Sequence, residues 1–185
     1  ADRLRPVTVT EKSEYDTDDP KIWVHPRNPD STLVLGTDKD EDGALLVYNL
    51  EGIIKRELSV YGIKRPNNVD IEYGLSLGGK TVDIAVVTER YENRLRVFSL
   101  PDMKPVDRGG IPVFEGSDKR APMGVALFRR PDDGAVFAIV SRKEGDRDGY
   151  LWQYRLSDDG NGSVTGVKVR SFGKWSGRGE IEAIA

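Results

Sequence analysis

Three basic residues stand at the same place relative to three similar apolar segments. Each lies two residues after a hydroxyl residue that closes an apolar run. The three pairs are Thr37 and Lys39, Thr88 and Arg90, and Ser141 and Lys143. Taken singly, each cation is better explained as a solvated loop charge. Their recurrence at one spacing favours a site for a polyanion, because clustered cations repel one another unless an anion or intervening carboxylates lie among them.

Acidic residues accompany these cations near the predicted strand ends. The candidate metal ligands are Asp18, Asp19, Glu144 and Glu182. The sequence has no cysteine and a single histidine, His25, which argues against thiolate and imidazole metal sites. Any metal here should therefore be a hard cation held by Asp and Glu oxygens, that is calcium or magnesium. Calcium ions and basic side chains could then share phosphate oxygens. Taken alone, the run Asp-Asp-Pro at 18–20 is better explained as a turn before a strand.

The composition limits the class of protein. The length of 185 residues predicts one domain, or two at most. With 37 % hydrophobic and 32 % charged residues, we expect a core under a heavily charged surface. The net charge of −3 argues against broad electrostatic binding to nucleic acid. No run approaches 18 uninterrupted apolar residues, so we expect no membrane-spanning helix. No signal peptide is visible in the residues that follow Ala1.

The elements that must position these side chains are predicted to be β-strands. Most apolar segments are short, rich in Val, Ile, Tyr and Phe, and bounded by Gly, Asp, Asn or Pro, which is typical of strands joined by tight turns. The clearest examples are 32–37, 45–50, 81–88, 95–100, 136–141 and 151–156. No segment shows a helical period with caps, so the predicted fold class is all-β.

An internal repeat narrows the architecture. Leu50, Leu100 and Leu156 each end a strand after an aromatic and a polar residue, at spacings of 50 and then 56 residues. Repeats of about 50 residues, each a four-stranded antiparallel meander, favour a β-propeller. The predicted blades are 18–60, 67–114 and 122–172, with 180–185 as the first strand of a fourth, in a single partial domain over 1–185. Since propellers have about four to eight blades, we expect a fragment, one half of a nicked protein, or one partner in an assembly.

Several motifs now make a resemblance specific. They are Asp18–Pro26 (DDPKIWVHP), Asn67–Ile71 (NNVDI), Lys143–Gly145 followed by Gln153–Tyr154, Val167–Phe172, and Glu182–Ala185. In this order and spacing, from about residue 16 to the last residue, the sequence resembles the N-terminal half of the β-propeller phytases, which are calcium-dependent alkaline phytases. Met123 departs from the Tyr that many members have there, and Arg3–Val7 lacks the acidic residues expected before Pro-Val.

The resemblance implies a six-bladed fold that hydrolyses phosphomonoesters of myo-inositol hexakisphosphate (phytate) with metal-activated water, as a 3-phytase. It implies phosphate contacts by Lys39, Arg90 and Lys143, which with Glu182 would be the catalytic residues. Asp18, Glu144 and Glu182 would bind active-site calcium, and Asp19 a structural calcium. It also implies several bound calcium ions and a calcium–phytate complex as the substrate. C-terminal blades would be supplied beyond this chain, for instance by a second chain, and the protein would be secreted or periplasmic.

Three alternatives remain open at the level of the sequence. A non-catalytic half-propeller that binds phytate or calcium would keep the cations but lack enough metal ligands. Another calcium-dependent propeller hydrolase, such as a lactonase, would have no use for three aligned cations. An interaction propeller would need neither calcium nor phosphate.

Overall fold

The computed structural model describes residues 4–184, which form three four-stranded antiparallel sheets and two short 3-10 helices. The first sheet comprises β1 (Thr17–Trp23), β2 (Leu33–Asp38), β3 (Gly43–Tyr48) and β4 (Val60–Ile63). The second comprises β5 (Pro66–Leu77), β6 (Lys80–Glu89), β7 (Arg94–Leu100) and β8 (Ile111–Pro112). The third comprises β9 (Pro122–Arg129), β10 (Val136–Arg142), β11 (Asp148–Asp158) and β12 (Val164–Lys174). The 3-10 helices are η1 (Pro29–Ser31) and η2 (Arg90–Glu92).

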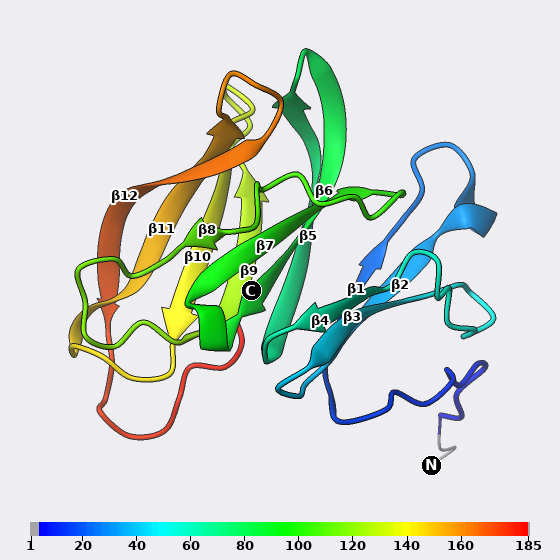
Figure 1. Ribbon diagram of the computed structural model, residues 1–185, viewed down its shortest axis with the longest axis horizontal. Helices are drawn as coiled ribbons and strands as arrows, with labels where there is room; N and C mark the ends of the chain where they lie inside the picture. The colour runs from blue at the N-terminus through cyan, green and yellow to red at the C-terminus, as the bar shows by residue number, and fades with distance from the viewer. Residues whose placement is uncertain (1–3, 185) are drawn as a thin grey trace.

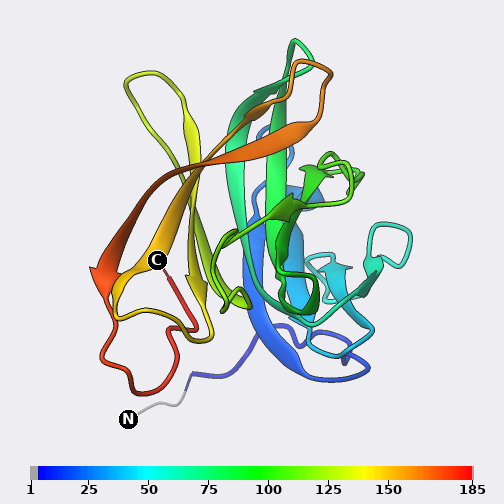
Figure 2. The same ribbon diagram turned by 60° about the vertical axis from the view of Figure 1, so that its left-hand side comes forward.

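The three sheets follow one another in chain order (Figure 1). Within each sheet the strands are hydrogen-bonded in sequence order, and the first strands β1, β5 and β9 of neighbouring sheets lie side by side. At the far end, Figure 2 shows the β5–β6 turn beside the β11–β12 turn, where the Gly78 N–H donates to an Asp158 carboxylate oxygen at 2.5 Å.

The side chains of β6, in the middle sheet, face the first and the third sheet in turn, which explains why the three sheets stack on one another. Ala85 and Val87 of β6 belong to the apolar core shared with the first sheet, whereas Ile84 and Val86 belong to the core shared with the third. Successive strand residues point to opposite faces, so a strand that is apolar throughout must be covered on both. Each fully buried Val or Ile side chain contributes about 1.5–3 kcal/mol to folding, which makes the two intersheet cores the main source of stability.

The predicted all-β class is confirmed, and three consecutive four-stranded sheets are consistent with a propeller-like fold. The sheets cover 17–63, 66–112 and 122–174. A closed ring of six blades stays a prediction. No helix in the described part of the chain is long and apolar enough to cross a membrane.

The segment after β12 differs from the sequence-based expectation of a strand at 180–185. Residues 181–184 form no strand, and Ala185 lies outside the described residues. In Figure 1 this red segment runs back from β12 toward β9. It meets the third sheet through a side chain, because the Ser141 hydroxyl donates to the Ile181 carbonyl at 2.6 Å. A strand requires a ladder of backbone pairs with a neighbour, and among residues 4–184 this segment has none.

Candidate functional site

The hydroxyl residues that the sequence singled out join the sheets to one another. Thr37, Thr88 and Ser141 are buried, and each accepts a backbone N–H from the first strand of its own sheet. Each then donates to a backbone carbonyl in the segment that follows its sheet in the stack. The donors are Asp19 (2.9 Å), Asn68 (3.0 Å) and Gly124 (2.8 Å), and the acceptors are Asn67 (2.9 Å), Met123 (2.9 Å) and Ile181 (2.6 Å).

These repeated bonds bring the three predicted cations to the same end of successive sheets. Lys39 Nζ lies 2.9 Å from an Asp18 oxygen and 3.5 Å from an Asp16 oxygen, and the hydrogen bond to Asp18 raises the pKa of Lys39. Lys143 Nζ lies 2.5 Å from a Glu180 oxygen. Arg90 is a half-buried residue, and the arginine ion pairs of its sheet among residues 4–184 involve Arg94 and Arg96 rather than Arg90. Arg90 is therefore the cation of the three that is best available to an anion.

A pocket of about 140 Å³ lies among the first strands and the last described segment. It is lined by Asp18, Asp19, Asn67, Asn68, Met123, Glu182 and Ala183. The pocket thus unites three of the four predicted metal ligands. Asp19 also accepts the Val69 N–H at 2.9 Å, which fixes its carboxylate between the first two sheets.

The fourth predicted ligand, Glu144, lies elsewhere. Its carboxylate is 3.0 Å from Lys119 Nζ, and it lines a separate pocket with Asp118, Asp146 and Trp175. Within the described part of the chain, no three His, Asp or Glu side chains converge closely enough to hold a metal ion as they are placed. The structure therefore groups Asp18, Asp19 and Glu182 in one pocket without arranging them around one point.

The donor chemistry of the pocket nevertheless fits a hard cation. Asn67 is 2 % exposed, and its side-chain oxygen Oδ1 has no hydrogen-bond partner among the described residues. A buried, unsatisfied polar atom costs about 1–3 kcal/mol, and an amide oxygen beside carboxylates is a typical calcium ligand. Sequence reasoning missed Asn67. The repeat carried the signal, since Asn67 holds the position in the second sheet that Asp18 holds in the first.

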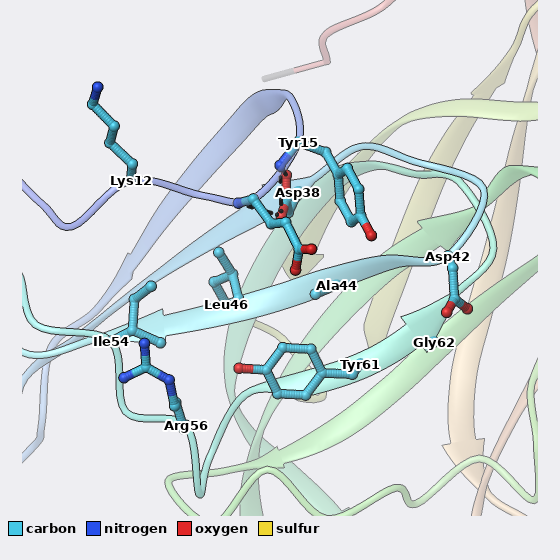
Figure 3. A pocket seen from close by; sticks show the side chains of 11 residues that line it. Lys12, Tyr15, Asp38, Asp42, Ala44, Leu46, Ile54, Arg56, Tyr61 and Gly62 are labelled. Carbon is cyan, nitrogen blue, oxygen red and sulfur yellow. Dashed lines mark hydrogen bonds between the residues drawn. The ribbon is translucent and has the colours of Figure 1, made fainter.

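A further pocket, on the outer face of the first sheet, contains none of the predicted site residues (Figure 3). Ala44 and Leu46 of β3 lie on one side of it, and the segment that carries Lys12 and Tyr15 lies on the other. Asp38 holds this segment by accepting the Tyr15 N–H at 3.0 Å. The Asp38 side chain is 2 % exposed and belongs to the interior.

The structure is thus that of an all-β, propeller-like protein, with three cations at one end of its stacked sheets and a pocket lined by carboxylates. A family model described as Phytase matches residues 5–183. The chain is also 33 % identical over 165 residues to a 3-phytase of Bacillus subtilis (strain 168), across 84 % of this chain and 39 % of that protein. The chain therefore belongs to the phytase family, as the motifs predicted, and it spans about two fifths of the length of this curated relative.

Proposed function

We propose that this chain supplies part of the active site of a phytase, a phosphoric monoester hydrolase of the 3-phytase type that depends on calcium. The observation that carries the proposal is the alignment of Lys39, Arg90 and Lys143 at one end of three stacked sheets, next to a pocket lined by oxygen donors. Membership of the family and the similarity to a 3-phytase support the choice of phytate as substrate.

The cations act as contacts for neighbouring phosphate groups. Arg90 suits the central contact, because a planar guanidinium can donate two parallel hydrogen bonds to one phosphate. Lys39 and Lys143 are point charges that pair with Asp18 and Glu180 in this structure, so a phosphate group would compete with these carboxylates. Residues on three different sheets would then contact one polyphosphorylated ring, which a monophosphate could not span.

Calcium would be held by the oxygen donors of the same region. Asp18 and Glu182 would bind active-site calcium and Asp19 a structural calcium; all three line one pocket with Asn67, whose side-chain oxygen has no partner among the described residues. Glu144 beside Lys143 remains a proposed ligand on the strength of the resemblance. Bound calcium would neutralise phosphate charge and lower the pKa of a water molecule that attacks phosphorus. The protein's own task is to hold the phosphates and to keep its carboxylates near them, and Glu182 is the proposed catalytic carboxylate.

The rest of the proposal concerns the whole protein. Its substrate would be a calcium–phytate complex, and it would act as a secreted or periplasmic enzyme. Further blades, beyond these residues or on a second chain, would complete the propeller and supply more acidic ligands.

The test is phosphate release from phytate with calcium and with a chelator, on material whose intact mass shows whether a second chain is present. Phytate affinity is measured in parallel by calorimetry for the unmodified chain and for Arg90→Gln. The matched control is Arg155→Gln, because Arg155 is an exposed arginine on β11 away from the three cations. We expect Arg90→Gln to weaken phytate binding at least about tenfold, the loss of one charge-assisted contact, and Arg155→Gln to leave it unchanged.

Binding without calcium-dependent release would favour the non-catalytic half-propeller. Equal phytate affinity for the unmodified chain and both variants would contradict the cation site.

A further inference from the structure

A buried charged residue separates the hydroxyl from the cation in every repeat. These residues are Asp38, Glu89 and Arg142, and they are 2 %, 1 % and 2 % exposed. Charged side chains are rarely so buried unless their polar atoms are satisfied, since an unpaired buried charge is strongly destabilising. Three such residues at one position of a repeat indicate a shared task.

Each buried charge binds the segment that leads into the first strand of its own sheet. The Asp38 carboxylate accepts the N–H groups of Glu14 (3.1 Å) and Tyr15 (3.0 Å), just before β1. Glu89 accepts the Lys64 N–H at 2.9 Å, just before β5. Arg142 Nη1 donates to Ser117 Oγ at 2.7 Å and to the Lys119 carbonyl at 3.2 Å, just before β9.

The cation that follows is tied to the same segment by its backbone. The Lys39 N–H donates to the Asp16 carbonyl at 2.8 Å, the Arg90 N–H to Arg65 at 3.2 Å, and the Lys143 N–H to Ala121 at 2.8 Å. Each cation is thus the last of three consecutive residues that all bind neighbouring segments. Its side chain starts from a backbone position that the buried charge helps to fix.

We propose that Asp38, Glu89 and Arg142 are positioning residues, which hold the lead-in segment in place and thereby set where Lys39, Arg90 and Lys143 meet the substrate. The part that concerns substrate rests on the proposed function, whereas the anchoring of the cation's backbone does not. The sign of the buried charge follows its partners, because Asp38 and Glu89 accept backbone N–H groups and Arg142 donates to oxygens.

Glu89 offers the sharpest case. One carboxylate oxygen accepts the Lys64 N–H, and the other accepts from Arg94 Nε at 2.5 Å. Arg65, whose carbonyl receives the Arg90 N–H, has a φ of 60°, in the left-handed region that residues other than glycine seldom adopt. Such a conformation persists only where surrounding contacts enforce it. Removing the Glu89 acceptor should therefore release this turn and the Arg90 backbone with it.

The experiment measures amide hydrogen exchange in the full chain for Glu89→Met. The control is Asp107→Leu. Asp107, in the connection between β7 and β8, is also buried (3 % exposed) and also accepts from an arginine and a backbone N–H, those of Arg96 and Val97 at 2.8 Å. Asp107 adjoins none of the three cations in sequence.

We expect Glu89→Met to speed exchange at the Arg90 and Tyr91 amides at least about tenfold relative to the other amides of its sheet, as in a local opening. Asp107→Leu should leave those two amides at the average for the sheet, and Glu89→Gln, which keeps an oxygen for the Lys64 N–H, should restore most of the protection.

The opposite result overturns the proposal, namely Arg90 and Tyr91 amides that exchange no faster in Glu89→Met than in Asp107→Leu. If Glu89→Met does not fold, Asp38→Leu provides the same test, with the Lys39 amide as the reporter, and an unchanged Lys39 amide contradicts the proposal equally.

Phytate binding separates this proposal from the proposed function. If Glu89 acts through Arg90, Glu89→Met weakens phytate binding severalfold in the unmodified chain and has no further effect once Arg90 is replaced by Gln, which is a double-mutant cycle with strong coupling. Equal effects in both backgrounds would limit Glu89 to a structural role. If Arg90→Gln alone leaves phytate affinity unchanged, the proposed function fails, while the exchange result at Arg90 still decides the anchoring.

Discussion

The two ends of β10 carry arginines in opposite environments. Arg130, in the turn between β9 and β10, is 47 % exposed and forms a two-point ion pair with Asp133 at 2.8 and 2.5 Å. Arg142, at the other end, is 2 % exposed, and its nearest carboxylate, that of Asp146, is 4.0 Å away. Arg142 instead donates to neutral oxygens and lies over the rings of Phe114, Tyr150 and Trp152.

The difference shows that ion-pair geometry is a poor guide to what an arginine contributes. An exposed pair gains little, because water screens it and two long side chains lose freedom. A buried guanidinium that is hydrogen-bonded and packed on aromatic rings is a fixed part of the interior, and its removal leaves oxygens without donors. The end of the sheets that carries the predicted site is thus the end built from buried charge.

The largest effect is expected for Arg142→Met. The change removes both hydrogen bonds to the 117–119 segment and the contacts with three rings, and it should lower the free energy of unfolding by about 3 kcal/mol. Urea denaturation measures this decrease in the free energy of unfolding. Arg155→Met, on the exposed face of the neighbouring strand, should change stability by less than about 0.5 kcal/mol, and a similar loss in both variants would remove the contrast.

A buried hydroxyl in the same sheet should show its effect at high pH. Burial raises the pKa of Tyr154 to about 12, and the Tyr154 oxygen accepts the Phe114 N–H at 2.8 Å. Since this pKa lies above the ordinary value of 10.0, the contribution of Tyr154 is complete below pH 10 and is lost as the pH rises toward 12. The loss should amount to about 2 kcal/mol.

Denaturation curves at pH 8 and pH 11.5 test this. Tyr154→Phe should be less stable at pH 8 and should lose less stability than the unmodified chain between the two values. Parallel losses in the two proteins would show that other groups account for the pH dependence.

Replacement of Ser141 tests a second buried polar residue at the end of β10 that carries Arg142. Ser141→Ala leaves the Gly124 N–H and the Ile181 carbonyl without their partner and should cost about 1–2 kcal/mol. Exchange at the amides of 181–183 should rise, because the hydroxyl holds that segment against β9. Ser141→Thr, which copies the residue used at 37 and 88, should preserve most of the protection, and equal exchange in the two variants would argue against the hydroxyl bridge.

The smallest effect is expected at the exposed end. Arg130→Met breaks the ion pair with Asp133 but should cost less than about 0.5 kcal/mol. Denaturation in low and high salt measures both the loss and its screening. A loss as large as that of Arg142→Met would overturn the contrast between the two ends of β10.

Much of the fold could be predicted because each repeat contains a short apolar segment that ends in a hydroxyl residue, and this pattern is visible in the sequence. The apolar segments before Thr37, Thr88 and Ser141 became β2, β6 and β10, and alternation along them determined which residues face each neighbouring sheet. The last segment could not be predicted in this way. An apolar run around Ile181 has the composition of a strand, but a strand forms only where a partner strand offers its backbone groups.

The candidate site, too, could be predicted from the sequence only in part. The sequence by itself determined the recurring hydroxyl and cation, because the two-residue spacing is visible in the chain. Only the tertiary structure decided that Asp38, Glu89 and Arg142 lie in the interior and that Asn67 presents an unpartnered oxygen to the pocket. A charged residue beside a turn is by default solvated. Burial depends on which segment folds over the residue, and that segment is distant in sequence from Asp38, Glu89 and Arg142 alike.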